Sequence, residues 1–158
     1  MALDQDFRAA MRRLAATVNV VTVRAGGRPM GMAATAVSSV SSDPPSVLVC
    51  VNQSASMHNV LVESSLFCIN ILHQDQLDVA RVFSDSALRD ARFSTGQWEH
   101  DAEAPPFLSD AQSVLLCERK ISTTFATHSI CIGTVREVRL RADIDPLLYV
   151  DGRYARIG

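Results

Sequence analysis

Residues 31–41 are small and hydroxylated, a composition that allows a ligand to approach the backbone closely. Glycine and alanine side chains are short enough to let a flat ring come near the main chain. The serine and threonine hydroxyls in the same stretch can donate and accept hydrogen bonds, which suits a phosphate group. The same residue types also occur where strands pack closely or turns need local hydrogen bonds, so packing is an equal alternative for this stretch taken alone.

Residues that suit anion binding follow in the chain. Asp43-Pro44-Pro45 is a turn signal, a predicted strand ends at Cys50-Val51-Asn52, and Ser54 and Ser56 stand at the start of a predicted short helix. The start of a helix attracts anions through its unpaired N–H groups. We therefore predict that residues 31–52 form part of a ligand pocket.

Other familiar chemistries have no signature in the sequence. There is no Gly-x-Gly-x-x-Gly after a strand, no Walker loop and no Gly-x-Ser-x-Gly elbow. The cysteines and histidines show no metal-ligand spacing, so we expect buried reduced thiols and no metal site. These residues are Cys50, Cys68, Cys117, Cys131, His58, His73, His100 and His128.

Length and composition limit the remaining possibilities. The chain has 158 residues, 47% hydrophobic and 20% charged, which predicts one folded domain over residues 1–158. A formal net charge of −2 gives no broad attraction to nucleic acid or an anionic membrane. Because no apolar run approaches the roughly 20 residues of a membrane helix and the N-terminus lacks a signal-peptide core, we expect a cytoplasmic protein.

Hydrophobic periodicity predicts three helices among many strands. Helices are predicted over residues 5–16, with Asp4 or Asp6 as the cap, over a short segment from Ser54 or Ser56 to Val62, and over residues 74–83. Strands are predicted over residues 17–24, 30–36, 37–41, 46–51, 66–72, 113–124, 130–141, 147–150 and 153–157. Residues 84–110 are polar and contain Gly96, Pro105 and Pro106, so we predict a long loop that can cover a ligand site.

The spacing of these strands predicts the fold class. The turns between them are too short for crossover helices, which favours antiparallel pairing over a doubly wound parallel sheet. Eight or nine such strands are enough to close a barrel with little exposed edge. We therefore expect a mainly β protein, an antiparallel β-barrel with short flanking helices.

An ordered series of short motifs runs through nearly the whole chain. They are Phe7-Arg8-Ala9-Ala10-Met11, Val20-Val21-Thr22, Gly31-Met32-Ala33-Ala34-Thr35-Ala36, Ser39-Val40-Ser41, Asp43-Pro44-Pro45, Val47-Leu48-Val49-Cys50-Val51, Phe67-Cys68-Ile69-Asn70-Ile71-Leu72, Ala80-Arg81-Val82-Phe83, Arg92-Phe93, Ile130-Cys131-Ile132-Gly133 and Pro146-Leu147-Leu148-Tyr149 with Gly152-Arg153-Tyr154. The series resembles the short-chain flavin reductases, which have an FMN-binding split-barrel fold and serve as reductase components of two-component monooxygenases.

The resemblance implies a homodimer of split barrels with a flavin, FMN or FAD, near the subunit interface. It places Met32, Thr35 and Ala36 along the isoalloxazine ring, with Ser39 and Ser41 near the ribityl chain or phosphate. The other implied flavin-binding residues are Cys50, Val51 and Asn52 at the ring edge, Ser54 and Ser56 at the phosphate, and Phe83 on the far side, with Arg89 as a further phosphate contact.

The implied reaction is hydride transfer from the nicotinamide C4 of NADH or NADPH to flavin N5. The cofactors perform this chemistry, so no catalytic acid or base is needed from the protein, which supplies stacking geometry and excludes water. We predict that reduced flavin is released to a flavin-dependent monooxygenase, because small residues around the ring favour modest affinity.

The hydride-donor side departs from the family pattern. Members carry a Gly-Asp-His motif associated with nicotinamide binding, and this chain has Ala126-Thr127-His128, so only His128 matches. A flavin-binding electron carrier or sensor with tightly held FMN and little nicotinamide activity is therefore an alternative. A barrel that binds no flavin is a third, in which residues 35–41 serve only packing.

Overall fold

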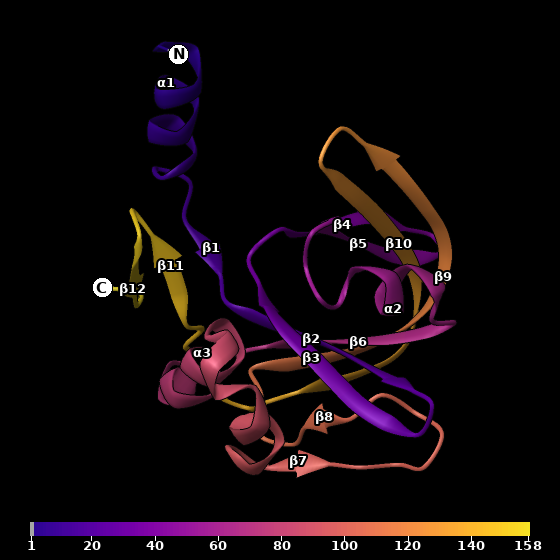
Figure 1. Cartoon of the computed structure of the whole chain (residues 1–158). Helices are drawn as coiled ribbons and strands as arrows, with labels where there is room; N and C mark the ends of the chain where they lie inside the picture. Colours follow the sequence, from indigo (N-terminus) through magenta and orange to yellow (C-terminus); the bar gives the residue numbers. More distant parts are fainter. Residues whose placement is uncertain (1) are drawn as a thin grey trace.

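The computed structural model describes residues 2–158, and seven strands form its main sheet in the order β3-β2-β6-β9-β10-β5-β4 (Figure 1). The strands are β2 (Asn19–Ala25), β3 (Arg28–Ala34), β4 (Val37–Ser42), β5 (Pro45–Asn52), β6 (Leu66–Ile71), β9 (Ser113–Phe125) and β10 (His128–Leu140). Every neighbouring pair in this sheet is antiparallel. The mainly β, antiparallel fold predicted from strand spacing is confirmed.

The curled sheet stays open between β3 and β4. These strands are consecutive in the sequence but lie at opposite ends of the strand order, so neither forms a ladder with the other. Thr35 and Ala36 cross the opening, and the N–H of Cys50 donates to the carbonyl of Ala36 at 3.0 Å. The small, hydroxylated stretch singled out in the sequence therefore supplies both edges of a split barrel.

The tight β2–β3 hairpin follows from its turn residues. Gly26 and Gly27 have φ of 56° and 75°, a left-handed conformation that glycine adopts without steric cost. The two long strands β9 and β10 bend at register shifts, one of them between Ile132 and Gly133. At this bend a Cβ on Gly133 would lie 2.7 Å from the Phe67 ring, so the close packing there requires glycine.

Two apolar clusters fill the two sides of the sheet. Inside the barrel, β2, β5, β6 and α2 (His58–Glu63) contribute side chains that include Val49, Leu61 and Phe67, all fully buried. On the other side, α3 (Leu77–Ser84) packs Val79, Ala80 and Phe83 against the sheet. Burial of such side chains is the main stabilising term of the fold.

The helices differ in their bounds from the predictions. The first helix, α1 (Ala2–Met11), begins and ends earlier than residues 5–16, and Asp4 and Asp6 lie inside it rather than capping it. The predicted helix over residues 74–83 is a single 3₁₀ turn, η1 (Gln74–Gln76), followed by α3. Periodicity located these helices, but end positions depend on capping and packing that the pattern does not encode.

The predicted loop over residues 84–110 is wrong in part. It contains the 3₁₀ segment η2 (Ser86–Ser94) and the two short strands β7 (Trp98–Glu99) and β8 (Phe107–Leu108). The ring of Trp98 lies 5.3 Å from Phe83 and 5.1 Å from Phe93, centroid to centroid. Tertiary packing of these aromatic rings therefore orders a segment whose local sequence is typical of a loop.

A small second sheet carries the N-terminal helix away from the barrel. β1 (Ala16–Thr17) pairs with β11 (Leu148–Val150), which pairs with β12 (Arg153–Ala155), and α1 projects beyond them (Figure 1). No residue of α1 is buried. The exposed fractions of its larger apolar side chains and of the next one along the chain are Leu3 80%, Phe7 61%, Met11 49% and Leu14 66%.

An ionic cluster ties the end of β10 to the start of η1. The guanidinium of Arg141 donates to both carboxylate oxygens of Asp75, at 3.1 and 2.9 Å, and to Asp143 at 2.8 Å. The hydrogen bond from Arg141 is the largest effect on the pKa of Asp75, which is held below its ordinary value of 3.8. The same arginine lowers the pKa of Asp143.

We predict that this cluster stabilises the fold at neutral pH and loses its effect in acid. A depressed carboxylate pKa adds stability above about pH 4 and loses it as pH falls through the folded-state pKa. Arg141→Gln should therefore lower Tm at pH 7, and its deficit relative to the parent should shrink toward pH 2 in thermal melts followed by circular dichroism. Arg81→Gln removes an arginine whose nearest carboxylate, Asp78, is 3.9 Å away, and serves as the charge-matched control. A deficit for Arg141→Gln that stays constant with pH would contradict the prediction.

Candidate functional site

The open side of the barrel is lined by half-buried apolar side chains. Met30, Met32 and Ala34 of β3 and Val37 of β4 pack against the inner core but keep part of their surface exposed. Edge strands also leave backbone N–H and C=O groups without a strand partner. The opening thus combines an apolar wall with free hydrogen-bonding groups, the usual features of a site for a flat, polar-edged ligand.

Most of the predicted site residues have side chains with accessible surface. Those that are exposed are Thr35, Ala36, Ser39, Ser41, Asn52, Ser54 and Ser56, and those that are half-buried are Met32 and Cys50. Val51 is only 1% exposed and belongs to the core, since alternate residues of β5 face opposite sides. Val51 can therefore offer a ligand only its backbone.

Phe83 was predicted to flank the flavin from the far side. In the structure it is buried behind β3 instead. Its side chain is 2% exposed and packs with Phe93 and Trp98. A Cβ on Gly31 would lie 2.7 Å from Phe83 Cε1, so the ring presses directly on β3 from behind. Phe83 supports the strand, and Gly31 is needed to let the ring come this close.

The segment after β5 folds back on itself through Asn52. The Asn52 Oδ1 accepts hydrogen bonds from the backbone N–H and the hydroxyl of Ser54, both at 2.9 Å. The helix that follows has Met57 as its N-cap, with no side-chain capping bond, so the prediction that Ser54 or Ser56 caps it is wrong. Ser56 instead faces a neighbouring cavity.

This cavity has a volume of about 370 Å³ and lies between β3, the Ser56 loop and η2. It is rich in basic side chains: Arg28, Arg89 and Arg92 line it, with Asp90 as the acidic side chain in its wall. Met30 and Met57 add apolar surface. Such a mixture of positive charge and apolar contact suits a ligand that has an anionic group at one end.

Arg92 is the most unusual residue in the cavity wall. It is 9% exposed, and its Nε and Nη1 donate to the carbonyls of Val82 and Gly31 at 3.0 and 2.9 Å. Its other N–H groups make no hydrogen bond within residues 2–158, and no carboxylate there forms an ion pair with it. Burial lowers the pKa of Arg92, and the nearby charge of Arg89 lowers it further. The charge of Asp85 opposes these effects in part, but no carboxylate in the described part of the chain forms an ion pair with Arg92, so a bound anion would stabilise this buried cation.

Sequence reasoning did not single out this arginine as a candidate binding residue. Arg92 was noted only as one half of the Arg92-Phe93 pair, while Arg89, which also lines the cavity, was the predicted charged contact. An arginine in a segment expected to be an exposed loop carries no sign of burial. Only the ordering of η2 against β3 places its guanidinium beneath the edge strand.

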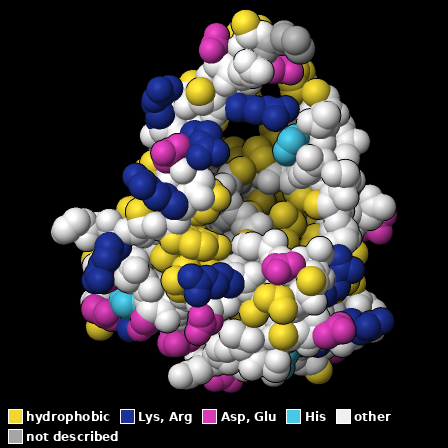
Figure 2. Space-filling view, turned by 60° about the vertical axis from the view of Figure 1, so that its left-hand side comes forward, with side chains coloured by type: hydrophobic (Ala, Val, Ile, Leu, Met, Phe, Trp, Pro, Cys, Tyr) yellow, Lys and Arg dark blue, Asp and Glu magenta, His cyan; other side chains and the backbone are white. Residues whose placement is uncertain are grey.

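A second hollow lies beneath α1. Figure 2 shows this face of the molecule, with hydrophobic side chains on the floor of a depression and basic side chains on its rim. The groove has a volume of about 430 Å³ and is lined by Phe7, Met11, Thr35 and Tyr149 among others. A smaller adjoining cavity of about 220 Å³ shares Thr35 and Tyr149. Thr35 therefore stands between the split and the surface covered by α1.

The β9–β10 turn places His128 beside Asn52 at the end of β5. His128 is the register partner of Asn52, so the two side chains lie on the same face of the sheet. Its Nδ1 lies 2.8 Å from the hydroxyl of Thr127. Ala126 has a φ of 49°, a left-handed conformation that favours glycine, so alanine here keeps the turn at some conformational cost.

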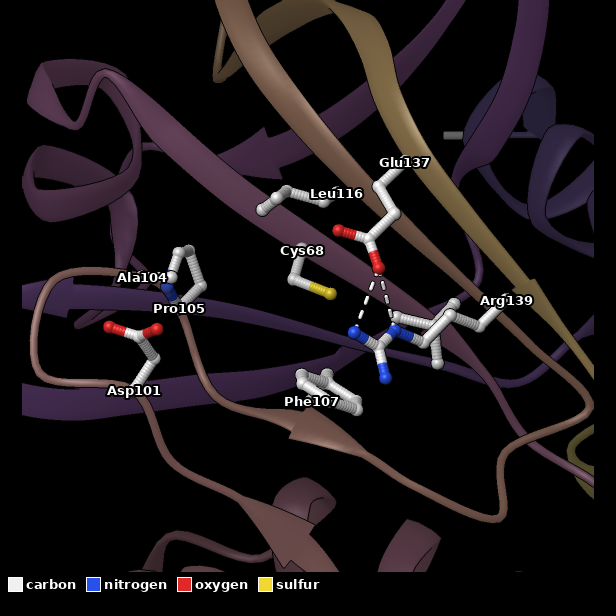
Figure 3. Close-up of a pocket in the computed structure, with 9 residues that line it drawn as sticks. Cys68, Asp101, Ala104, Pro105, Phe107, Leu116, Glu137 and Arg139 are labelled. Carbon is white, nitrogen blue, oxygen red and sulfur yellow. Dashed lines mark hydrogen bonds and ion pairs between the residues drawn. The ribbon is translucent and has the colours of Figure 1, made fainter.

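A further cavity, of about 210 Å³, contains none of the predicted site residues. It lies on β6, β9 and β10 beneath the loop that carries Pro105 and Phe107, and Figure 3 shows Arg139 paired with Glu137 over this site. Cys68 forms part of its wall. Burial, with a smaller effect of Cys117, raises the pKa of Cys68 to about 12, so its thiol is protonated and unreactive at neutral pH.

Within residues 2–158 no three histidine, cysteine or acidic side chains are grouped so as to hold a metal ion. In the same part of the chain, no helix is long and apolar enough to cross a membrane. All four cysteines are free thiols.

Comparison with known proteins gives a consistent result. The model of the flavin reductase like domain matches residues 11–158. An FMN reductase (NADH) RutF of Pseudomonas syringae pv. syringae is 38% identical over 94% of this chain and 83% of its own. The reductase component of an FADH(2)-dependent resorcinol hydroxylase of Rhizobium sp. is 38% identical over 96% of this chain and 86% of its own.

Solved structures agree with these sequence matches. The Streptomyces globisporus C-1027 NADH:FAD oxidoreductase SgcE6, solved in complex with NAD and FAD fragments, superimposes with a TM-score of 0.89. It is 29% identical in sequence, and the match covers 98% of this chain and 93% of that one.

Proposed function

Because the chain belongs to the flavin reductase like family, we infer that it transfers a hydride from NADH or NADPH to FMN or FAD. The chain is an NAD(P)H-dependent flavin oxidoreductase, and it supplies reduced flavin to a flavin-dependent monooxygenase. The resemblance noted in the sequence and the family match over residues 11–158 agree on this function.

The observation that carries the site assignment is the buried guanidinium of Arg92 at the end of the split. A flavin nucleotide has a flat ring at one end and a phosphate at the other. The split offers apolar and small side chains for the ring, and the basic cavity offers Arg92 with N–H donors still available. The residues of this chain therefore fit the cofactor that the family uses.

We assign the flavin phosphate to the cavity of Arg92, Arg89 and Ser56. The ring is assigned to Met32 of β3 and to Thr35 and Ala36, which connect β3 to β4. Asn52 and Cys50 supply its edge contacts, the backbone of Val51 lies beside them, and Ser39 and Ser41 supply hydroxyls along the outer edge strand. Ser54 acts indirectly, because its hydroxyl is already bonded to Asn52.

When bound, the flavin accepts the hydride and supplies all of the redox chemistry. The chain's own residues bind the flavin and the nicotinamide and orient them. Met32 and the small residues after it would contact the flavin ring and orient it for the transfer. His128 and Thr127, next to Asn52, are the residues that we assign to the nicotinamide side.

Release of the product follows from the same geometry. The exposed residues Thr35, Ala36 and Asn52 leave one side of the ring site open to solvent. An open site with small side chains holds its ligand less tightly than an enclosed one. Reduced flavin can therefore leave for the monooxygenase, and the four free thiols are compatible with work in the reducing cytoplasm.

We propose that the working unit is a homodimer joined through α1. A helix of ten residues without packing is marginally stable in water, since isolated helices shorter than about 12 to 15 residues rarely persist. Leu3, Phe7, Met11 and Leu14 recur at helical spacing and are exposed. A second copy seated on this face would bury them beside Thr35.

The proposed function predicts a measurable activity. The purified chain should oxidise NADH or NADPH when FMN or FAD is added, followed as loss of nicotinamide absorbance, and the flavin should exchange with the medium. Tight yellow copurification without nicotinamide oxidation would favour the electron carrier. No turnover with either flavin and either nicotinamide would overturn the reductase function.

The assignment of the phosphate to the Arg92 cavity can be tested by substitution. Arg92→Gln should raise the Kd for FMN about tenfold or more, because hydrogen bonds to a charged group contribute roughly 1.5–3 kcal/mol. The Kd of Arg92→Lys for FMN should lie between those of the wild type and Arg92→Gln, since lysine keeps the charge but lacks the planar guanidinium. Riboflavin, which lacks the phosphate, is the matched control in the same fluorescence titration. Equal weakening of riboflavin and FMN would show that Arg92 acts only on the fold.

The proposed dimer can be tested by placing a charge on α1. Phe7→Asp should shift the chain toward monomer in sedimentation velocity, because it places a charge on the apolar face of α1. Gln5→Asp adds the same charge about half a turn away around the helix and should leave the dimer intact. A wild-type chain that sediments as a monomer at micromolar concentration would refute the assignment.

A further inference from the structure

His58 connects the start of α2 to β10 through a chain of hydrogen bonds. Its Nε2 lies 2.8 Å from the hydroxyl of Ser129, and that hydroxyl lies 3.0 Å from the hydroxyl of Thr124. On the other side of the ring, Nδ1 lies 2.9 Å from the Oδ1 of Asn59. An amide oxygen only accepts, so Nδ1 is the donor and, in the neutral imidazole, Nε2 accepts from Ser129.

The position of Ser129 makes this bond more than a surface contact. Ser129 is 2% exposed and faces the barrel interior, where its register partner Val51 is also buried. His128 and Asn52, one position along each strand, have side chains on the opposite face. The His58–Ser129 bond therefore anchors β10 from inside, directly behind the pair that we assign to nicotinamide and flavin.

A second tie joins the same two segments from outside. The backbone N–H of Gln53 donates to the carbonyl of Thr127 at 2.9 Å, and its side-chain Nε2 donates to the carbonyl of Ala126 at 2.7 Å. Residues 52–58 and the turn at residues 124–129 are thus bonded at both ends. The first segment carries Ser56 into the basic cavity, and the second carries His128.

We propose that His58 is a positioning residue that holds the flavin-phosphate loop and the hydride-donor turn as one rigid unit. This proposal rests on the proposed function, because it names how the two binding segments of that site depend on each other. Flavin affinity and nicotinamide use should both depend on the bond between His58 and Ser129, which adds to the tie through Gln53. The chemical step itself should not, because His58 is not among the residues that we assign to either ring.

Two substitutions at the same position separate this bond from the rest of the side chain. His58→Gln keeps a polar group near the place of Nε2 and can still accept from Ser129. His58→Asn keeps a group near the place of Nδ1 but is too short to reach Ser129. His58→Asn should raise both the flavin Kd and the nicotinamide KM about three- to tenfold, the range expected for one hydrogen bond. His58→Gln should keep both close to wild type, and kcat should stay unchanged in both variants.

Removing the other partner provides the cross-check. Ser129→Ala should reproduce the effects of His58→Asn, and the double variant should be no worse than either single one. Val62→Ala on the same helix is the stability control, and should lower Tm while leaving the flavin Kd and nicotinamide KM unchanged. Flavin Kd is measured by fluorescence quenching in the absence of nicotinamide, so it reports independently of turnover.

The outcomes are distinct. Parallel increases in both constants for His58→Asn and Ser129→Ala, with recovery in His58→Gln, support the proposal. Three results would overturn the proposal. They are an increase in only the flavin Kd or only the nicotinamide KM, equal increases for His58→Gln and His58→Asn, and additive effects in the double variant. Failure of the proposed function would instead show in the wild-type chain, which would then bind no flavin or oxidise no nicotinamide.

Discussion

The gap between β3 and β4 is the constraint on which the rest of the structure depends. A barrel that closed its ladder here would satisfy both edges but leave no room for a ligand. Residues 31–41 avoid closure by running along one edge, crossing at Thr35 and Ala36 and returning along the other. Everything assigned to the site, including the basic cavity and the turn with His128, lies beside or behind these two edges.

An open edge needs support, and α3 and η2 supply it. Phe83 presses on β3 at Gly31, where no Cβ would fit, and Arg92 donates to the carbonyl of the same glycine. One residue without a side chain thus receives an aromatic ring and a guanidinium at once. The second contact leaves a buried positive charge beside the opening, so the support of the strand and the attraction for a phosphate come from the same side chain.

Much of the fold followed from local pattern. Alternation and β-branched residues located all the long strands, and the glycines at 26 and 27 located the first hairpin. The same reasoning failed for residues 84–110. Their order comes from the packing of Phe83, Phe93 and Trp98 against one another, which the local pattern does not show. Helix ends were missed for a related reason: Asp4, Ser54 and Ser56 are good caps by type, but none of them caps a helix here.

For the candidate site, the sequence by itself determined which segments take part, because small and hydroxylated residues between strands are a local property. It also determined that His128 stands without the usual glycine and aspartate before it. Only the tertiary structure decided which side chains reach the opening. Burial turned Phe83 and Val51 inward and placed Arg92 beneath β3, because a side chain's exposure depends on what packs on it from elsewhere in the chain.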